Sequence, residues 1–298
     1  MSAEPLASLQ VRLYGFRLRV TGPAPAVEPL RPLFFSRSQE PPAAPPDALM
    51  EVARAGPGYE VRQAGKGKVF EGEEWSDLFW WLDEWFFETV LSYADACLHI
   101  HAAAVARGDR AILLIGDSHS GKSTLALHLL LRGYQFMTDE TVLVEPASLE
   151  LRPFPRNLVV REDTVRGDPA LERLCRERTQ CLLQGSGYAP RWFMDPAFLG
   201  SPEIPATASV DRIVCLQRQE SGPPLLEEVG ARAAVEDMLR QQSNLRWYGA
   251  AAGVGTMIRL AELGRNYRLS AVHPGEAWEA LREHLGLERC PAGEGSGR

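Results

Sequence analysis

The stretch from Gly116 to Thr124 carries the residue types that bind nucleoside phosphates. It reads Gly-Asp-Ser-His-Ser-Gly-Lys-Ser-Thr and fits the pattern G-x-x-x-x-G-K-[ST]. In such a loop the glycines let backbone amides converge on phosphates, the Lys122 ammonium meets the β- and γ-oxygens, and the Ser123 hydroxyl binds Mg²⁺. The predicted ATP-binding residues are Gly116, Asp117, Ser118, His119, Ser120, Gly121, Lys122, Ser123 and Thr124.

The sequence around this loop supplies the elements that would position it. The apolar run Ala111–Ile115 in front predicts a strand, and Leu125–Leu131 behind has helical composition up to Gly133. Strand, loop and helix therefore come in the order that a phosphate-binding loop requires. Leu98–Ala106 predicts a further short strand, which the turn Arg107–Arg110 joins to the loop strand as a hairpin.

Two acidic residues after the predicted helix are candidates for the chemistry. The loop alone does not choose between hydrolase, motor, switch and kinase, but a magnesium–phosphate complex needs a carboxylate partner. Asp139 and Glu140 are the first acids after the helix, and they precede the apolar run Thr141–Val144, which predicts a strand. In the commoner nucleotide hydrolases, the metal-linked acid follows four apolar residues at the end of a strand.

Composition excludes several classes of protein. The chain has 298 residues, of which 45% are apolar and 24% charged, and this is enough for one large core or one core with a smaller lobe. The net charge of −7 argues against a nucleic-acid partner. The five cysteines lack C-x-x-C spacing, which favours reduced thiols over disulfides or zinc. Without a signal segment or a membrane-spanning apolar run, we expect a cytoplasmic protein and no membrane partner.

The N-terminal part predicts β structure followed by a helix. Residues 8–20 alternate apolar and polar side chains, with an irregularity at Gly15, and predict a strand or hairpin. The proline-rich stretch Pro23–Pro46 predicts a connecting loop. Trp75–Ala96 has apolar residues at spacings of three and four, which predicts a helix whose aromatic face packs the N-terminal lobe onto the nucleotide-binding domain instead of binding a ligand.

The C-terminal part predicts one more core strand and two helices. The strand is expected at Asp211–Leu216, and the helices at Ala233–Gln241 and Glu276–Leu285. The Gly- and Ala-rich segment Gly249–Gly255 predicts a turn between helices.

Together these patterns predict an α/β fold. We expect a nucleotide-binding domain at 96–289 with a mixed sheet flanked by helices, a small α+β lobe at 1–95 and a disordered tail at 290–298.

The loop and its flanks resemble the HPr kinase family over roughly residues 98–160. These bacterial enzymes phosphorylate a serine of a carrier protein and share a core with ATP-dependent phosphoenolpyruvate carboxykinases. The matching features are His101 in His-Ala-Ala-Ala-Val, the loop itself, the pair Arg132-Gly133 and the acidic pair Asp139-Glu140. The resemblance implies a P-loop-containing HPr kinase/phosphoenolpyruvate carboxykinase-like core.

The resemblance also implies roles for individual residues. One acid of the pair accepts the proton of the attacking hydroxyl, and we assign that role to Asp139, with Lys122 spreading the developing charge. Glu140, Asp139 and Ser123 would hold Mg²⁺, and which acid is base and which is ligand stays open. His101 would orient a phosphate or the base. Arg156 could clamp the transferred phosphoryl group, and Arg161 is a second guanidinium in the same region.

This chain departs from the family at three places. The family usually has glycine at the position of His119, and two aspartates where this chain has Asp139-Glu140. Val159–Glu162 is the nearest match to the family's Glu-Ile-Arg-Gly segment and lacks its Glu, so phosphorolysis is not implied. Arg152–Leu158 resembles instead the shorter HPr kinase-related proteins encoded beside peptide-modification genes.

The leading functional prediction is an ATP- and Mg²⁺-dependent kinase that acts on a hydroxyl, by preference a serine, of a peptide or small protein. The alternative is a catalytically slow nucleotide-binding subunit with a regulatory or assembly role. A carboxykinase-like metabolic enzyme would share the core, but the sequence shows no cluster of metal-binding His and Lys residues. HPr kinases form hexamers, and a homo-oligomer, a dimer and a monomer all remain open for this chain.

Overall fold

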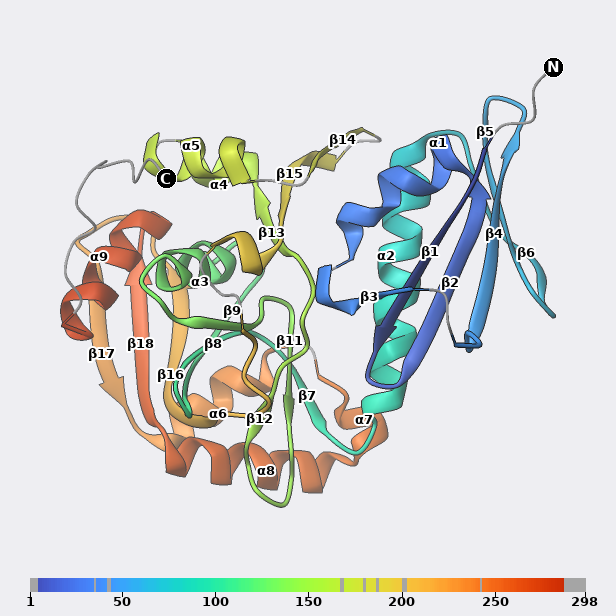
Figure 1. Cartoon of the computed structure of the whole chain (residues 1–298). Coiled ribbons are helices and arrows are strands. Elements are labelled where there is room, and N and C mark those ends of the chain that lie inside the picture. The colour runs from blue at the N-terminus through green and yellow to red at the C-terminus, as the bar shows by residue number, and fades with distance from the viewer. Residues whose placement is uncertain are drawn as a thin grey trace. The chain divides into compact units, whose positions relative to one another are not determined.

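The computed structural model (Figure 1) describes residues 5–34, 36–41, 44–166, 169–178, 181–185, 188–199, 203–241 and 243–286. The tail predicted to be disordered, 290–298, lies outside these residues. Contacts between Cα atoms divide the chain into two compact units. The first comprises Met1–Asp95 and Thr179–Asp195, and the second comprises Ala96–Arg178 and Pro196–Arg298. Nothing in the sequence pattern indicated that Thr179–Asp195 groups with the N-terminal unit.

The first unit is built on a sheet in the order β3-β1-β2-β4-β5-β6. Neighbouring strands are antiparallel except β2 and β4, which run parallel. The predicted irregularity at Gly15 is confirmed, because Tyr14 (φ 49°) and Gly15 (φ 86°) form the tight turn of the β1–β2 hairpin. The strands are β1 (Leu6–Leu13), β2 (Phe16–Pro23), β3 (Gln39–Glu40), β4 (Ala48–Ala55), β5 (Gly58–Gln63) and β6 (Gly67–Gly72), and a separate hairpin consists of β14 (Cys181–Gly185) and β15 (Tyr188–Met194).

The aromatic stripe of the predicted helix is a core face of this unit. Helix α2 (Trp75–Leu91) buries Phe79 and Phe86. Phe86 meets Phe34 edge-on with ring centroids 5.1 Å apart, and Phe79 meets Phe193 of β15 at 4.9 Å. Edge-to-face contacts of this kind add to the free energy gained from burial. The aromatic stripe is therefore a packing face, and these contacts lie within the first unit itself.

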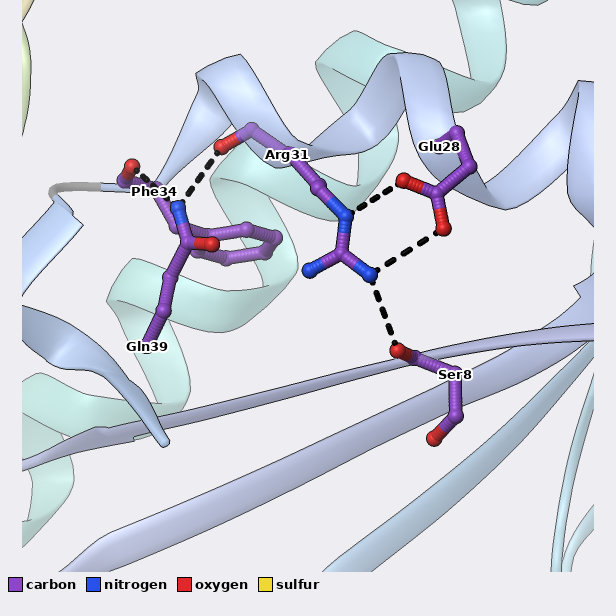
Figure 2. Close-up of polar contacts among 5 residues, drawn as sticks. All are labelled: Ser8, Glu28, Arg31, Phe34 and Gln39. Atoms are coloured by element: carbon purple, nitrogen blue, oxygen red, sulfur yellow. Dashed lines mark hydrogen bonds and ion pairs between the residues drawn. The ribbon is translucent and has the colours of Figure 1, made fainter. Parts of the chain in front are cut away.

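The proline-rich stretch contains more regular structure than we predicted. Helix α1 (Ala24–Val27) leads into the 3₁₀ helices η1 (Glu28–Leu33) and η2 (Ser36–Ser38) and then into β3, so the expected connecting loop is wrong for this part. Figure 2 shows the polar contacts that hold it: Arg31 donates to Glu28 and to the carbonyl of Ser8, and the amide of Gln39 donates to the carbonyl of Phe34. Proline in the first turn of α1 and of η1 is tolerated because the first N–H groups of a helix have no acceptor within it.

The second unit has a mixed α/β architecture around a sheet in the order β10-β8-β9-β16-β18-β17. β9 is parallel to β16, and β16 to β18, whereas β8 is antiparallel to both of its neighbours, β9 and β10. β10 therefore runs parallel to β9, and both strands end at the same edge of the sheet. The predicted hairpin is confirmed for Ala103–Arg107, but the single strand predicted at Leu98–Ala106 is divided at Ala102, whose N–H donates to the Glu140 carbonyl, into two strands of different sheets. The strands of the larger sheet are β8 (Ala103–Arg107), β9 (Arg110–Gly116), β10 (Gln135–Thr138), β16 (Ser209–Arg218), β17 (Leu225–Val229) and β18 (Arg265–Ala271).

A second, three-stranded sheet is formed by strands that come directly before β8 and after β10 in the chain. Its order is β12-β11-β7, and Thr141 of β11 is paired with His101 of β7. The buried side chain of Asn244 fixes β7 from the other side, because its amide accepts from the His99 N–H and donates to the Cys97 carbonyl, each at 2.9 Å. The strands are β7 (Leu98–His101), β11 (Thr141–Val144) and β12 (Leu151–Arg152).

Helices cover the larger sheet of the second unit. α6 and α8 contact each other and the strands β9 and β16, and they share a core with Leu113 and Ile115, whereas α3 contacts β8, β9 and α9 (Figure 1). Burial of the whole run Ala111–Ile115 is typical of a strand with both faces covered. The helices are α3 (Lys122–Leu130), α4 (Glu162–Val165), α5 (Pro169–Arg178), α6 (Ala231–Leu239), α7 (Leu245–Tyr248), α8 (Ala250–Leu263) and α9 (Pro274–His284), with β13 (Leu158–Arg161) and the 3₁₀ helix η4 (Pro196–Leu199).

Of the four predictions for the C-terminal part of the chain, one is wrong and three are confirmed. The turn predicted at Gly249–Gly255 lies mostly within α8, because Met257, Leu260 and Ala261 give that helix a buried face that outweighs the low helix propensity of its glycines. The strand predicted at Asp211–Leu216 and the two predicted C-terminal helices correspond to β16, α6 and α9. In the part of the chain that the structure describes, no helix is long and apolar enough to span a bilayer.

A buried ion pair ties α6 to β18. The side chain of Asp237 is only 1% exposed. It accepts hydrogen bonds from Arg268 Nε at 2.9 Å and Nη2 at 3.1 Å, and from Arg240 Nη1 at 3.3 Å. The two-point contact with one guanidinium is the strong form of a charge-assisted hydrogen bond.

Candidate functional site

The predicted phosphate-binding sequence forms a strand, a loop and a helix. β9 ends at Gly116 and α3 begins at Lys122. Both flanking glycines have left-handed φ angles, 149° at Gly116 and 101° at Gly121. A Cβ atom on Gly116 would lie 2.5 Å from the carbonyl oxygen of Leu216, so only glycine fits there. The backbone itself therefore requires the first glycine of the motif.

Lys122 is a buried cation beside three acids. Its Nζ donates to the carbonyl oxygens of Gly116 at 2.7 Å and Asp117 at 3.2 Å. Burial lowers the pKa of Lys122, and the negative charges of Glu140, Asp117 and Asp139 oppose that shift. The structure thus brings the predicted lysine and both predicted acids into one electrostatic cluster.

Asp139 lies directly after β10 and is almost completely buried, with 4% of its surface exposed. Its Oδ2 accepts from the backbone N–H of Val159 at 3.0 Å. Its Oδ1 is buried and has no hydrogen-bond partner among the described residues. Burial raises the pKa of Asp139 to about 6, and repulsion from Glu140 adds to this, although the charge of Arg156 acts in the opposite direction. Such a group can take up and release a proton near neutral pH.

The pKa of the next residue, Glu140, is shifted in the opposite direction. Its Oε1 lies 3.3 Å from Nδ1 of His101, whose partner in the β7–β11 pair is the following residue, Thr141. Burial alone would raise the pKa of Glu140, but the hydrogen bond from His101 and the charges of Arg156 and Lys122 lower it to about 2. Glu140 is therefore ionised throughout the range in which Asp139 titrates.

A short turn orients the acidic pair. The buried hydroxyl of Thr138 accepts from the backbone N–H groups of Glu140 at 3.3 Å and Thr141 at 3.2 Å. The N–H of Ala102 donates to the Glu140 carbonyl at 3.1 Å. Thr138 was not among the predicted site residues, although a threonine immediately before two acids at a strand end is a recognisable turn signal.

Arg156 and Arg161 take different positions in this unit. Arg156 is half-buried, and its charge acts on both Asp139 and Glu140. Arg161 ends β13, and its Nη1 lies 2.9 Å from Nδ1 and 3.1 Å from Nε2 of His119 at the tip of the loop. Both arginines were candidates from the sequence, but no sequence pattern pairs Arg161 with His119.

The remaining loop residues differ in exposure. Asp117, Ser118 and His119 are exposed, Ser123 is half-buried, and Thr124 is buried in the first turn of α3. The Ser120 N–H donates to the Asp117 carbonyl at 3.1 Å, which closes the loop. The Ser120 Oγ is buried and, like Asp139 Oδ1, has no partner among the described residues.

The donor set fits Mg²⁺ only together with phosphate oxygens. Within the described residues, no group of three His, Cys, Asp or Glu side chains could hold a metal ion by itself. Mg²⁺ is commonly bound through one or two carboxylates together with substrate phosphates and water. The unpartnered Oδ1 of Asp139, the carboxylate of Glu140 and the hydroxyl of Ser123 are oxygen donors of the required kind.

Comparison with known proteins adds little to this geometry. No family model matches the chain, and no curated protein matches it. Among solved structures, the Hpr(Ser) kinase/phosphatase from Coxiella burnetii is similar at 16% sequence identity and a TM-score of 0.31. The match covers 63% of this chain and 87% of that one. At this TM-score the likeness supports no conclusion about activity, so the proposed function depends on the site itself.

Proposed function

We propose that this protein is an ATP- and Mg²⁺-dependent kinase that transfers the γ-phosphoryl group to a hydroxyl, by preference a serine of a peptide or small protein. The observation that carries the proposal is the buried carboxylate of Asp139, which keeps one unpartnered oxygen. It lies just beyond the strand end on the sheet edge where the glycine loop begins. Ligands of open parallel sheets bind at this edge.

The reaction needs a base for the acceptor. The hydroxyl oxygen forms a bond to the γ-phosphorus, the bond from that phosphorus to the β–γ bridging oxygen breaks, and ADP leaves. The hydroxyl proton passes to Oδ1 of Asp139. With a pKa of about 6, this carboxylate is ionised at neutral pH and is still a stronger base than an ordinary aspartate.

The other side chains of the site would bind the phosphates and Mg²⁺ and hold one another in place. Lys122 would exchange the carbonyls of Gly116 and Asp117 for phosphate oxygens, since one ammonium cannot satisfy both sets at once. His101 holds Glu140 in its ionised form. Bound Mg²⁺ would neutralise charge on the phosphates, with Ser123 and Glu140 as its candidate ligands, because Oδ1 of Asp139 cannot hold the metal and take the hydroxyl proton at once.

The experiment compares the parent protein with Asp139→Asn in two assays. Calorimetry measures the Kd for ATP with and without Mg²⁺, and a radiolabelled assay measures transfer from [γ-³²P]ATP to an array of serine-containing peptides. We expect Mg²⁺-dependent binding in both proteins and a loss of transfer of about 10²–10⁴-fold in Asp139→Asn, the usual contribution of a general base. Transfer by the parent should rise with pH through about 6.

Asp109→Asn is the matched control, because Asp109 is an exposed aspartate in the β8–β9 turn of the same unit. It should leave both assays unchanged. Equal transfer by Asp139→Asn and the parent would contradict the role of Asp139 as base. Tight nucleotide binding without transfer by the parent to any serine peptide or to water would favour the slow nucleotide-binding subunit over the kinase.

A further inference from the structure

The contact between His119 and Arg161 has no part in the site as proposed so far. His119 lies at the exposed tip of the loop with φ 69°, a left-handed backbone conformation that is unfavourable for a residue with a Cβ. Glycine would adopt this conformation without strain. A side chain at this position therefore needs a compensating interaction, and the ring of His119 has one in Nη1 of Arg161, at 2.9 and 3.1 Å.

The strand that carries Arg161 is already tied to the proposed base. The backbone N–H of Val159 in β13 donates to Oδ2 of Asp139 at 3.0 Å. Arg161 is two residues further along the same strand. β13 also contacts α3, the helix that follows the loop. One short strand thus fixes the Asp139 carboxylate and places a guanidinium at the loop tip.

The chemistry of the two side chains gives the contact a direction. Arginine has only hydrogen-bond donors, so one ring nitrogen of His119 must be the acceptor, and an acceptor nitrogen carries no proton. The loop tip is where the proposed function places a triphosphate, and a guanidinium binds phosphate oxygens through two parallel N–H groups. Lys122 supplies charge from the buried side of the loop, whereas Arg161 supplies it at the exposed tip.

We infer that Arg161 contacts the phosphates of the bound nucleotide and that His119 is the positioning residue that holds its guanidinium over the loop. The inference rests on the proposed function, since it assigns a further residue to the same nucleotide site.

The test measures the Kd of the full chain for Mg-ATP and for inorganic tripolyphosphate, together with the thermal unfolding midpoint without ligand. Arg161→Gln should weaken binding of both ligands by roughly 10-fold or more, the effect of losing a hydrogen bond to a charged group. Arg161→Lys should restore only part of this loss, because the ammonium lacks the planar fork. Arg166→Gln is the control, because Arg166 is an exposed arginine near β13 whose carboxylate partner is Glu162 at 3.6 Å, and it should change neither quantity.

Two substitutions at His119 separate positioning from backbone strain. His119→Gly relieves the strain but removes the acceptor, so it should weaken Mg-ATP binding by about 3-fold without lowering the unfolding midpoint. His119→Asn keeps an acceptor and tolerates the left-handed conformation, so it should bind within about 2-fold of the parent. The double variant His119→Gly/Arg161→Gln should bind no more weakly than Arg161→Gln alone.

The possible failures are distinguishable. If the parent binds Mg-ATP and Arg161→Gln binds it equally well, the inference is overturned and the proposed function stands. If His119→Gly binds as well as the parent, or if the two losses are additive, His119 does not position Arg161. If the parent does not bind Mg-ATP, the proposed function fails and this inference fails with it.

Discussion

Two buried aspartates of the second unit, Asp139 and Asp237, have opposite surroundings. Asp237 is 1% exposed and receives three hydrogen bonds from Arg268 and Arg240. Asp139 is 4% exposed, receives one bond from a backbone amide, and has an oxygen with no partner among the described residues. Both oxygens of the Asp237 carboxylate accept hydrogen bonds, whereas one oxygen of the Asp139 carboxylate accepts none from the described residues.

This difference shows how a structural carboxylate can be told from a chemical one. A buried charge is costly unless hydrogen bonds and an opposite charge compensate it, and the guanidinium of Arg268 supplies both to Asp237. At Asp139 the charge of Arg156 offsets only part of the cost of burial, and the pKa rises to about 6. Perturbed groups of this kind concentrate at functional sites.

The same chemical change should have opposite effects at the two positions. Asp237→Asn keeps the shape but removes the charge, which leaves Arg268 without its carboxylate partner, and we expect the free energy of unfolding to fall by about 3 kcal/mol. Urea denaturation at pH 8, followed by circular dichroism, measures it. A loss within 0.5 kcal/mol, the usual range for surface substitutions, would show that the ion pair is not structural.

Asp139→Asn should raise the free energy of unfolding at pH 8 by about 1–3 kcal/mol. The upper value follows from a carboxyl pKa that is about 2 units higher in the folded than in the unfolded protein. The folded state then binds more protons than the unfolded state between pH 4 and 6, so the parent loses stability as pH rises through that interval. The advantage of the variant should therefore disappear below about pH 4.

Denaturation curves of the parent, Asp139→Asn and the exposed control Asp109→Asn at pH 4, 6 and 8 provide the comparison. A variant that is less stable than the parent at pH 8 would mean that the Asp139 carboxylate is stabilised by the fold, like Asp237.

The smallest expected effect concerns α8, the helix that packs beside the one carrying Asp237. Gly255 lies in α8, and a Cβ there would meet no atom within 4 Å. Gly255→Ala should therefore raise the free energy of unfolding by about 0.5–1 kcal/mol, because alanine favours the helix. Gly230→Ala is the control, since Gly230 also has open space but precedes α6 outside any helix. Equal effects of the two substitutions would indicate that Gly255 is not in a helix.

The local part of the site could be predicted from the sequence, because it is continuous in the chain. β9, the glycine loop and α3 follow one another directly in the chain, and the spacing of glycine, lysine and hydroxyl residues identifies them. Asp139 and Glu140 were predicted to lie after this helix and before the strand Thr141–Val144, whereas β10, the strand directly before them, was not predicted. Their individual roles stay predictions.

The non-local part could not be predicted, because it depends on pairs far apart in the chain. His119 and Arg161 are 42 residues apart, and Asp237 and Arg268 are 31 apart. Tertiary packing also overrode local propensity in α8, where glycine and alanine indicated a turn but the buried face formed a helix. The helical structure between Pro23 and Pro46 was missed for the same reason, since prolines mark loops only where nothing else orders the chain.

The most direct measurement is a ¹³C NMR titration of the Asp139 carboxyl carbon in the full chain, assigned by difference from Asp139→Asn and recorded with and without Mg-ATP. We predict a midpoint near pH 6 without ligand and a change of that midpoint when Mg-ATP is added. An ordinary aspartate midpoint near 3.8 that Mg-ATP does not move would contradict Asp139 as the base of a nucleotide site.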